Sequence, residues 1–171
     1  SIPNLDQVLT AGNTSSQEGI LTALYGDFVL RDSLVAGNTG TNCVGVTSAG
    51  GNIEDAATCA GTGPGDLPNT DPMLGPYTGL WRGGADLTYF HAIDAASPAV
   101  DSATTCTWDH DGDAGTAEVA LTADQRRFPR PHDGDGDGTA VCDRGALEYH
   151  GFLFYDGFES GDTWSWDAVV P

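Results

Sequence analysis

The sequence predicts an all-β fold, in which the final rungs of a parallel β-helix are closed by a loop-rich, calcium-binding, disulfide-linked C-terminal cap. Three observations favour this fold. The 171 residues include 24 glycines and 9 prolines, so the chain turns often. A sequence repeat occupies the N-terminal third, and acidic loops lie between cysteines. Because helices need uninterrupted amphipathic windows, such frequent turns favour short strands.

Residues 1–60 carry the repeat. Leu9–Thr14 (LTAGNT) returns as Leu34–Thr39 (LVAGNT), and Gly26–Phe28 (GDF) aligns with Gly51–Ile53 (GNI) at the same offset of 25 residues. A period of about 20–30 residues is typical of one rung in a solenoid. The repeat therefore predicts that this region forms the last rungs of a β-helix. Chance similarity between loop-like segments is the alternative.

Equivalent residues of successive rungs lie above one another, about 4.8 Å apart. We therefore expect Asn13 to lie over Asn38 in a side-chain amide ladder, and Phe28 over Ile53 in an apolar stack inside the tube. A stack that ended bare would expose unpaired backbone groups and its core. A cap must follow, and residues 61–150 are predicted to supply it.

The predicted cap begins with residues 61–76, which are rich in the turn formers Gly, Pro and Asn. Residues 87–93 (LTYFHAI) are predicted to form a strand or one helical turn, with His91 in a structural hydrogen-bonding role. Residues 145–149 (GALEY) are predicted to form a final strand.

The four cysteines form two local pairs in the sequence, Cys43 with Cys59 and Cys106 with Cys142. Their even number, the lack of a C-x-x-C motif and the acidic, glycine-rich background indicate disulfides in an oxidising compartment. We expect the local pairing, although four cysteines allow three connectivities. A structural zinc site is the rival interpretation.

The charge is strongly one-sided, with 25 acidic residues against 6 basic ones and a formal net charge of −19. Such a chain repels nucleic acid and anionic membrane surfaces, and bound divalent cations would offset its self-repulsion. The sequence contains no apolar run long enough for a membrane span. It has no signal peptide and no initiator methionine, so we expect a secreted chain trimmed from a longer precursor.

Two acidic loops are candidate metal sites. Aspartates alternate with other residues, mainly glycine, at Asp109, Asp111 and Asp113 and again at Asp133, Asp135 and Asp137. This alternation lets a tight loop place several oxygen ligands around one hard cation, which favours Ca²⁺ over the stricter Mg²⁺. The alternative is a solvated acidic loop.

The second acidic loop resembles the first half of an EF-hand loop, with Gly138 at the sharp turn. The twelfth position is Arg144, however, and not a bidentate Glu, so an intact EF-hand is excluded. Asp143, Glu148 or the other acidic loop is expected to complete the ligand shell.

Arg126, Arg127 and Arg130 lie between the two acidic loops. We expect them to neutralise nearby carboxylates by bidentate pairing; binding of an acidic glycan is the functional alternative. Serine-hydrolase, zinc-protease, Walker and Rossmann signatures are missing from the sequence.

Residues 151–171 are a separate tail with a dense aromatic load. We expect the tail to dock on its own domain or on a neighbouring copy, because exposed aromatic side chains promote non-specific association. The candidate assembly residues are Phe152, Phe154, Phe158, Trp164 and Trp166.

Several motifs, in a matching order, resemble the terminal rung region of bacterial choice-of-anchor Q proteins. They lie at residues 28–43, 51–53, 71–76, 91–101, 124–131 and 142–149. The tail motif at residues 156–163 (DGFESGDT), with Trp166, is similar to a short C-terminal motif of secreted proteobacterial proteins. The resemblance implies a right-handed parallel β-helix, export and a cell-surface or extracellular location. It implies no catalytic residues.

Taken together, these features predict a non-catalytic extracellular protein: an adhesin, a stalk or a self-assembling fibre subunit stabilised by Ca²⁺ and disulfides. Self-association or cell-surface components are the expected partners, with a glycan as a further candidate. Two alternatives stay open. One is the C-terminal fragment of a β-helix polysaccharide lyase or hydrolase, and the other is a carbohydrate-binding module that uses exposed tryptophans.

Overall fold

The computed structural model describes residues 4–6, 9–10, 21–22, 28–59, 61–81, 87–109 and 115–151. These parts of the chain contain short strands, turns and irregular loops, and no helix. The strands are β1 (Asn4–Asp6), β2 (Leu9–Thr10), β3 (Leu21–Thr22), β4 (Phe28–Arg31), β5 (Leu34–Val35), β6 (Cys43–Val44), β7 (Val46–Gly50), β8 (Ile53–Glu54), β9 (Leu74–Trp81), β10 (Leu87–Ile93), β11 (Thr107–Trp108) and β12 (Val119–Ala120). The predicted all-β class is confirmed at this level.

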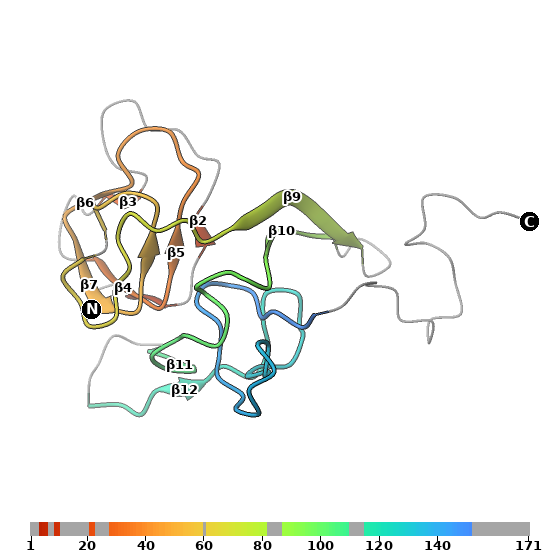
Figure 1. Cartoon of the computed structure of the whole chain (residues 1–171). Coiled ribbons are helices and arrows are strands. Elements are labelled where there is room, and N and C mark those ends of the chain that lie inside the picture. Colours follow the sequence, from red (N-terminus) through yellow and green to blue (C-terminus); the bar gives the residue numbers. More distant parts are fainter. Residues whose placement is uncertain are drawn as a thin grey trace, which may run out of the picture.

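The strands before residue 55 form small parallel sheets at one end of the molecule (Figure 1). Their orders are β1-β4-β7, β2-β5-β8 and β3-β6. Each strand therefore pairs with the strand that the chain forms on its next pass, and not with its immediate neighbour in sequence. The second sheet aligns Leu9 with Leu34 and Leu34 with Ile53, and a parallel bridge joins Ile53 to Leu67.

The first pass has the predicted length, because Leu9 pairs with Leu34 at an offset of 25 residues. The second pass is shorter: Phe28 pairs with Val46 and Leu34 with Ile53, offsets of 18 and 19 residues. The predicted stack of Phe28 over Ile53 is therefore wrong. Asn13 lies outside the described residues, so the predicted amide ladder stays a prediction.

The second pass is shorter because its connections are shorter. Ten residues separate β2 from β3, whereas seven separate β5 from β6. Five residues separate β3 from β4, but a single residue, Gly45 with φ 70°, separates β6 from β7. The 25-residue sequence repeat therefore predicts the wrong pairing register for the second pass, because the connections between its strands are shorter.

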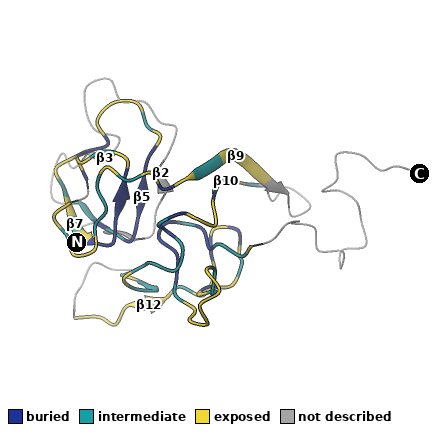
Figure 2. Cartoon of the chain, in the orientation of Figure 1, coloured by how far each residue is buried: buried dark blue, intermediate teal, exposed yellow. Residues whose placement is uncertain are grey.

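Strand β5 lies between two apolar clusters because successive side chains of a strand point to opposite faces. Val35 packs with Leu30 and with the Cys43 and Cys59 pair. Leu34 packs instead with Ile53 and with cap residues that include Ile93 and Ala99. Figure 2 shows β5 buried and most of β9 exposed. The second cluster attaches the parallel sheets to the cap.

The cap contains one long antiparallel hairpin, β9–β10, so residues 87–93 form a strand and not a helical turn. The stacked rings of Tyr77 and Tyr89 lie on its exposed face. A short antiparallel pair, β11–β12, lies nearer the C-terminal loops. Figure 1 shows the hairpin projecting away from the loop-rich part of the cap.

The strand predicted at residues 145–149 is not formed. Its backbone N–H groups bond to three separate acceptors instead of one partner strand. Gly145 donates to the carbonyl of Asp32, Glu148 to the carboxylate of Asp124, and Tyr149 to the carboxylate of Asp143. An apolar, β-prone sequence therefore becomes an irregular segment because acceptors from three separate segments replace a single partner strand.

Both predicted disulfides are present: Cys43 pairs with Cys59, and Cys106 pairs with Cys142. No cysteine is left free. The first bridge links β6 to the loop after β8, and the second links the residue just before β11 to Cys142. Two disulfides in so small a chain indicate an oxidising environment.

A buried carboxylate joins the parallel sheets to the cap. Asp32 is fully buried, and its two carboxylate oxygens accept hydrogen bonds from the N–H and hydroxyl groups of Thr104 and Thr105. Gly51 leaves room for it, because a Cβ there would lie 2.0 Å from Oδ1 of Asp32. This contact spans about seventy residues of sequence.

We predict that Asp32→Asn lowers the free energy of unfolding by about 1–3 kcal/mol, because its NH₂ group faces donors and leaves at least one without an acceptor. Urea unfolding followed by circular dichroism measures the change. Glu118, which forms an exposed pair with Arg31, provides the control. Glu118→Gln is expected to cost less than about 1 kcal/mol. Equal losses in the two variants would contradict the role given to Asp32.

Candidate metal centre

Three carboxylates from two separate segments meet in the cap. Oxygen atoms of Asp101, Asp133 and Asp135 all lie within 4.8 Å of one another. Asp101 follows the turn at residues 97–100, and the other two lie in the loop at residues 133–138. Asp101 and Asp133 are half-buried, and Asp135 is exposed.

Asp101 anchors the loop. Its Oδ2 accepts hydrogen bonds from the N–H groups of Gly134 (2.8 Å) and Asp135 (2.7 Å). Position 134 has little room for a side chain, because a Cβ there would lie 3.2 Å from that oxygen and 3.0 Å from Val100 Cγ1. Gly136 and Gly138 are not crowded in this way, but both have positive φ, which favours glycine.

The rest of the loop is built from turns in which a carboxylate accepts a nearby backbone N–H. Asp133 accepts from Gly136 (2.8 Å) and Gly138 (2.9 Å), both of which have positive φ. Asp135 accepts from Asp137 (3.0 Å). These bonds hold the loop backbone in place and leave each carboxylate with further lone pairs for a cation.

The structure brings two of the predicted metal ligands together, Asp133 and Asp135. Asp137 lies outside this cluster, and its carboxylate accepts the N–H of Thr139. Asp143 is fully buried and lies beneath the site, where its oxygens accept the N–H groups of Asp101 (2.7 Å) and Tyr149. It therefore positions Asp101 and does not belong to the cluster.

The other predicted acidic loop lies mostly outside the described residues. Asp109 is described and is half-buried. Asp111 and Asp113 fall in the part of the chain that the structure does not describe, so a second metal site there stays a prediction.

Asp101 was not predicted as a ligand. It lies 32 residues before Asp133, in a segment without alternating carboxylates, and only the fold brings it to the loop. One sequence signal pointed to it: Asp101 is the last residue of the stretch 91–101, which resembles a motif of the choice-of-anchor Q proteins.

The donor set suits a hard cation. Three carboxylates offer only oxygen, and Ca²⁺ accepts about six to eight oxygen ligands in flexible geometry. The arrangement contains no sulfur or imidazole ligand within the cluster, which disfavours zinc. Three carboxylates so close together also repel one another, and a bound cation removes that repulsion.

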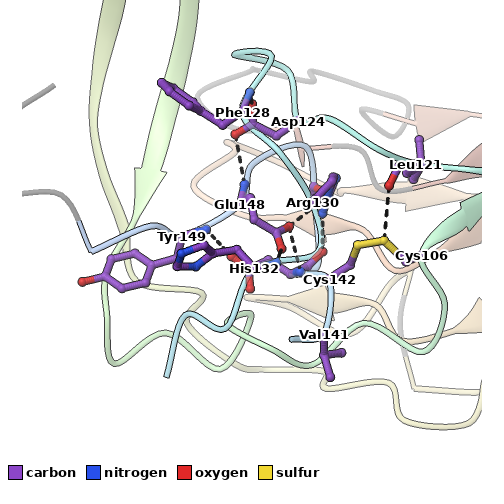
Figure 3. Close-up of polar contacts among 12 residues, drawn as sticks. Cys106, Leu121, Asp124, Phe128, Arg130, His132, Val141, Cys142, Glu148 and Tyr149 are labelled. Carbon is purple, nitrogen blue, oxygen red and sulfur yellow. Dashed lines mark hydrogen bonds and ion pairs between the residues drawn. A yellow bond between two sulfur atoms is a disulfide. The ribbon is translucent and has the colours of Figure 1, made fainter. Parts of the chain in front are cut away.

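A buried network of charges supports the loop from below, and Figure 3 shows its central contacts. Glu148 pairs with Arg130 (2.9 Å) and accepts the N–H of His132 (2.7 Å), directly before the loop. Arg130 also donates to the carbonyl of Asp143 (2.7 Å). The segment that carries the acidic loop is therefore fixed to the C-terminal segment of the cap.

The arginines between the acidic loops were predicted to neutralise carboxylates by bidentate pairing, and pairing with a carboxylate is confirmed for two of them. Arg130 pairs with Glu148, and Arg126 pairs with Asp124 (2.6 Å). Both arginines are buried, whereas Arg127 is exposed. Two of the three guanidinium groups that an acidic glycan would need are thus committed inside the protein.

Burial shifts the protonation of this network. It raises the pKa of Asp143 to about 7, although the N–H bonds from Asp101 and Tyr149 favour the charged form. Burial also raises the pKa of Glu148, against the opposing effect of Arg130. Folding therefore favours proton uptake by these two carboxyl groups.

No protein-family model, curated protein or solved structure matches this chain. Among the described residues, no helix is long and apolar enough to cross a membrane.

The raised pKa of Asp143 predicts how stability depends on pH in the absence of metal. A carboxyl group that binds its proton more tightly when folded contributes stability below its unfolded pKa. That contribution is lost as pH rises through about 7. Between pH 5 and 7 this group alone should therefore lower the free energy of unfolding by up to about 1.4 kcal/mol per pH unit.

Urea unfolding at pH 5, 6 and 7 in EDTA measures this slope. Asp143→Asn removes the titrating group and is expected to flatten the slope, whatever its effect on stability at one pH. Asp137→Asn, at an exposed position, is the control and should keep the wild-type slope. A wild-type slope that survives Asp143→Asn would refute the assignment.

Proposed function

We propose that this chain forms the closing end of a right-handed parallel β-helix, and that it is a secreted, non-catalytic structural module of a cell-surface or extracellular protein. The observation that carries the proposal is the order of the parallel pairs. Leu9, Leu34 and Ile53 follow one another across adjacent strands, and an isolated parallel bridge continues the series from Ile53 to Leu67. Parallel crossovers of this kind are right-handed in about 98% of cases.

The passes also become shorter toward the cap, which supports an end and not the middle of a solenoid. The offset between paired residues falls from 25 (Leu9 to Leu34) to 19 (Leu34 to Ile53) and then to 14 (Ile53 to Leu67). Ile93 and Ala99 of the cap then pack on Leu34 and Ile53. A solenoid needs such a cover because its last rung otherwise exposes core and backbone.

Glu54 supports the same interpretation at the last interior position. It pairs with Val35 across the sheet and is fully buried. Its carboxylate accepts the N–H groups of Thr58 (2.8 Å) and Cys59 (2.7 Å) and the side-chain amide of Asn42 (3.0 Å). The carboxylate of Glu54 thus ends the row of apolar side chains and accepts backbone N–H groups of the loop at residues 55–59.

Calcium, in this proposal, is bound by Asp101, Asp133 and Asp135 and makes the cap rigid. The ion would join the segment after β10 to the loop before Cys142, which are already linked by hydrogen bonds. The two disulfides support an extracellular location, where free Ca²⁺ is plentiful enough for sites of modest affinity.

The hydrogen bonds of the buried carboxylates support a structural role for the chain. Asp32, Glu54, Asp124, Asp143 and Glu148 are all buried and hydrogen-bonded to backbone N–H groups or arginines. A general acid or base must instead reach a substrate.

Incubation with acidic polysaccharides, assayed for new reducing ends and unsaturated products, is expected to show no turnover. Turnover by the purified chain would overturn the non-catalytic role.

Calcium binding has a separate test. Ca²⁺ at 100 times its dissociation constant should stabilise the fold by about 2.7 kcal/mol, which raises Tm by several degrees in a chain of this size. Calorimetry in EDTA and in Ca²⁺ measures the difference, and Asp101→Asn or Asp133→Asn should abolish it.

Asp94→Asn is the matched control for the calcium test. Asp94 is exposed and its carboxylate accepts the N–H of Ala96 in a local turn, but it lies outside the cluster. This variant should keep the full Ca²⁺ response. An identical Tm in EDTA and in Ca²⁺ for the wild-type chain would remove the calcium site from the proposal.

A further inference from the structure

We propose that residues 152–155 (FLFY) dock in a pocket of their own chain, between the β9–β10 hairpin and residues 147–151. We call this the hairpin pocket and define it by Phe90, Ile93, Arg126, Leu147, Tyr149 and Gly151, with Thr78 at its exposed side. This inference goes beyond the proposed structural role, and its test is independent of the calcium site.

The hairpin pocket suits an aromatic side chain. Its volume is about 370 Å³, within the range of pockets that hold small organic groups. Phe90, Ile93 and Leu147 form apolar walls that are themselves well packed. Thr78 and Phe90 face each other across the hairpin, so the pocket opens along one face of the two strands.

Arg126 adds a polar group that favours aromatic rings. Its guanidinium lies over the rings of Phe90 (5.3 Å) and Phe128 (5.1 Å), and it is held there by Asp124. Arg126 is therefore a fixed part of the pocket wall. The pocket is lined by apolar side chains and by a guanidinium that needs no reordering when the pocket is filled.

The position of the chain selects the occupant. Gly151 is part of the pocket wall and has a φ of 64°, and the four residues that follow it are all apolar or aromatic. At about 3.5 Å per residue they span about 14 Å, so the pocket lies within their reach. Attachment gives an effective concentration in the millimolar range for a short linker.

Charge disfavours a second copy as the source of the bound segment. Each chain has a net charge of −19, so two copies repel each other on approach. A segment already attached beside the pocket avoids that encounter. The occupant is therefore the chain's own tail, and not that of a neighbour.

Limited proteolysis of the full chain by chymotrypsin, read by mass spectrometry, tests the docking. Cleavage at residues 152–155 should be about tenfold slower than at Trp164 and Trp166 of the same tail. Thr78→Trp fills the pocket from an exposed position and should remove this protection. Equal cleavage rates at all tail aromatics in the wild-type chain, or protection that persists in Thr78→Trp, would overturn the proposal.

A second readout leaves the pocket residues untouched. Phe152→Ser combined with Phe154→Ser should shift the methyl NMR signals of Ile93 and Leu147, whereas Trp164→Ser with Trp166→Ser should not. Unchanged signals in the first variant would overturn the docking site. Protection that is lost on dilution, with a dimer in size-exclusion chromatography, would assign the pocket to a second copy and so refute docking within one chain.

Discussion

The carboxylate of Asp32 shows the interaction on which this fold depends: a buried acidic side chain that accepts backbone N–H groups from a distant segment. Asp32 contacts three distant segments of the chain. Its carboxylate accepts from Thr104 and Thr105, its N–H donates to the carbonyl of Gly50, and its carbonyl accepts the N–H of Gly145. Thr104, which the carboxylate holds, lies two residues before the Cys106–Cys142 bridge. The strands supply few regular partners, so these contacts satisfy backbone groups that would otherwise be buried without one.

Hydrogen bonds to buried acidic residues also explain how the protein tolerates its large negative net charge. A net charge of −19 suggested bound cations, yet many aspartates already have donors inside the protein. Asp66 is an example: burial opposes its charge, but bonds from Ser48, Asn52, Gly61 and Gly63 lower its pKa below the usual value. Hydrogen-bond donors of the protein therefore stabilise its charge. The strong acidity of the chain alone is thus no argument for bound cations.

The sequence predicted those features that depend on local pattern. The all-β class, both disulfide pairs, the first 25-residue pass and the pairing of Arg126 and Arg130 with carboxylates are present in the structure. Two predictions failed for different reasons. Shorter connections between the strands displaced Phe28 from Ile53, whereas acceptors from distant segments replaced a partner strand at residues 145–149. Asp101 was missed because only folding brings it to the acidic loop.

The shortening of successive passes has a further consequence for a protein built this way. The cap packs on Leu34 and Ile53 through Ile93 and Ala99, whereas β1, β2 and β3 each have a single strand neighbour among the described residues. In the proposed β-helix, wider turns of chain could therefore be added ahead of β1 while the packing of the closed side is kept. Each added turn would lengthen the molecule by about 4.8 Å, the spacing between neighbouring strands. The cap at the closed end would stay the same.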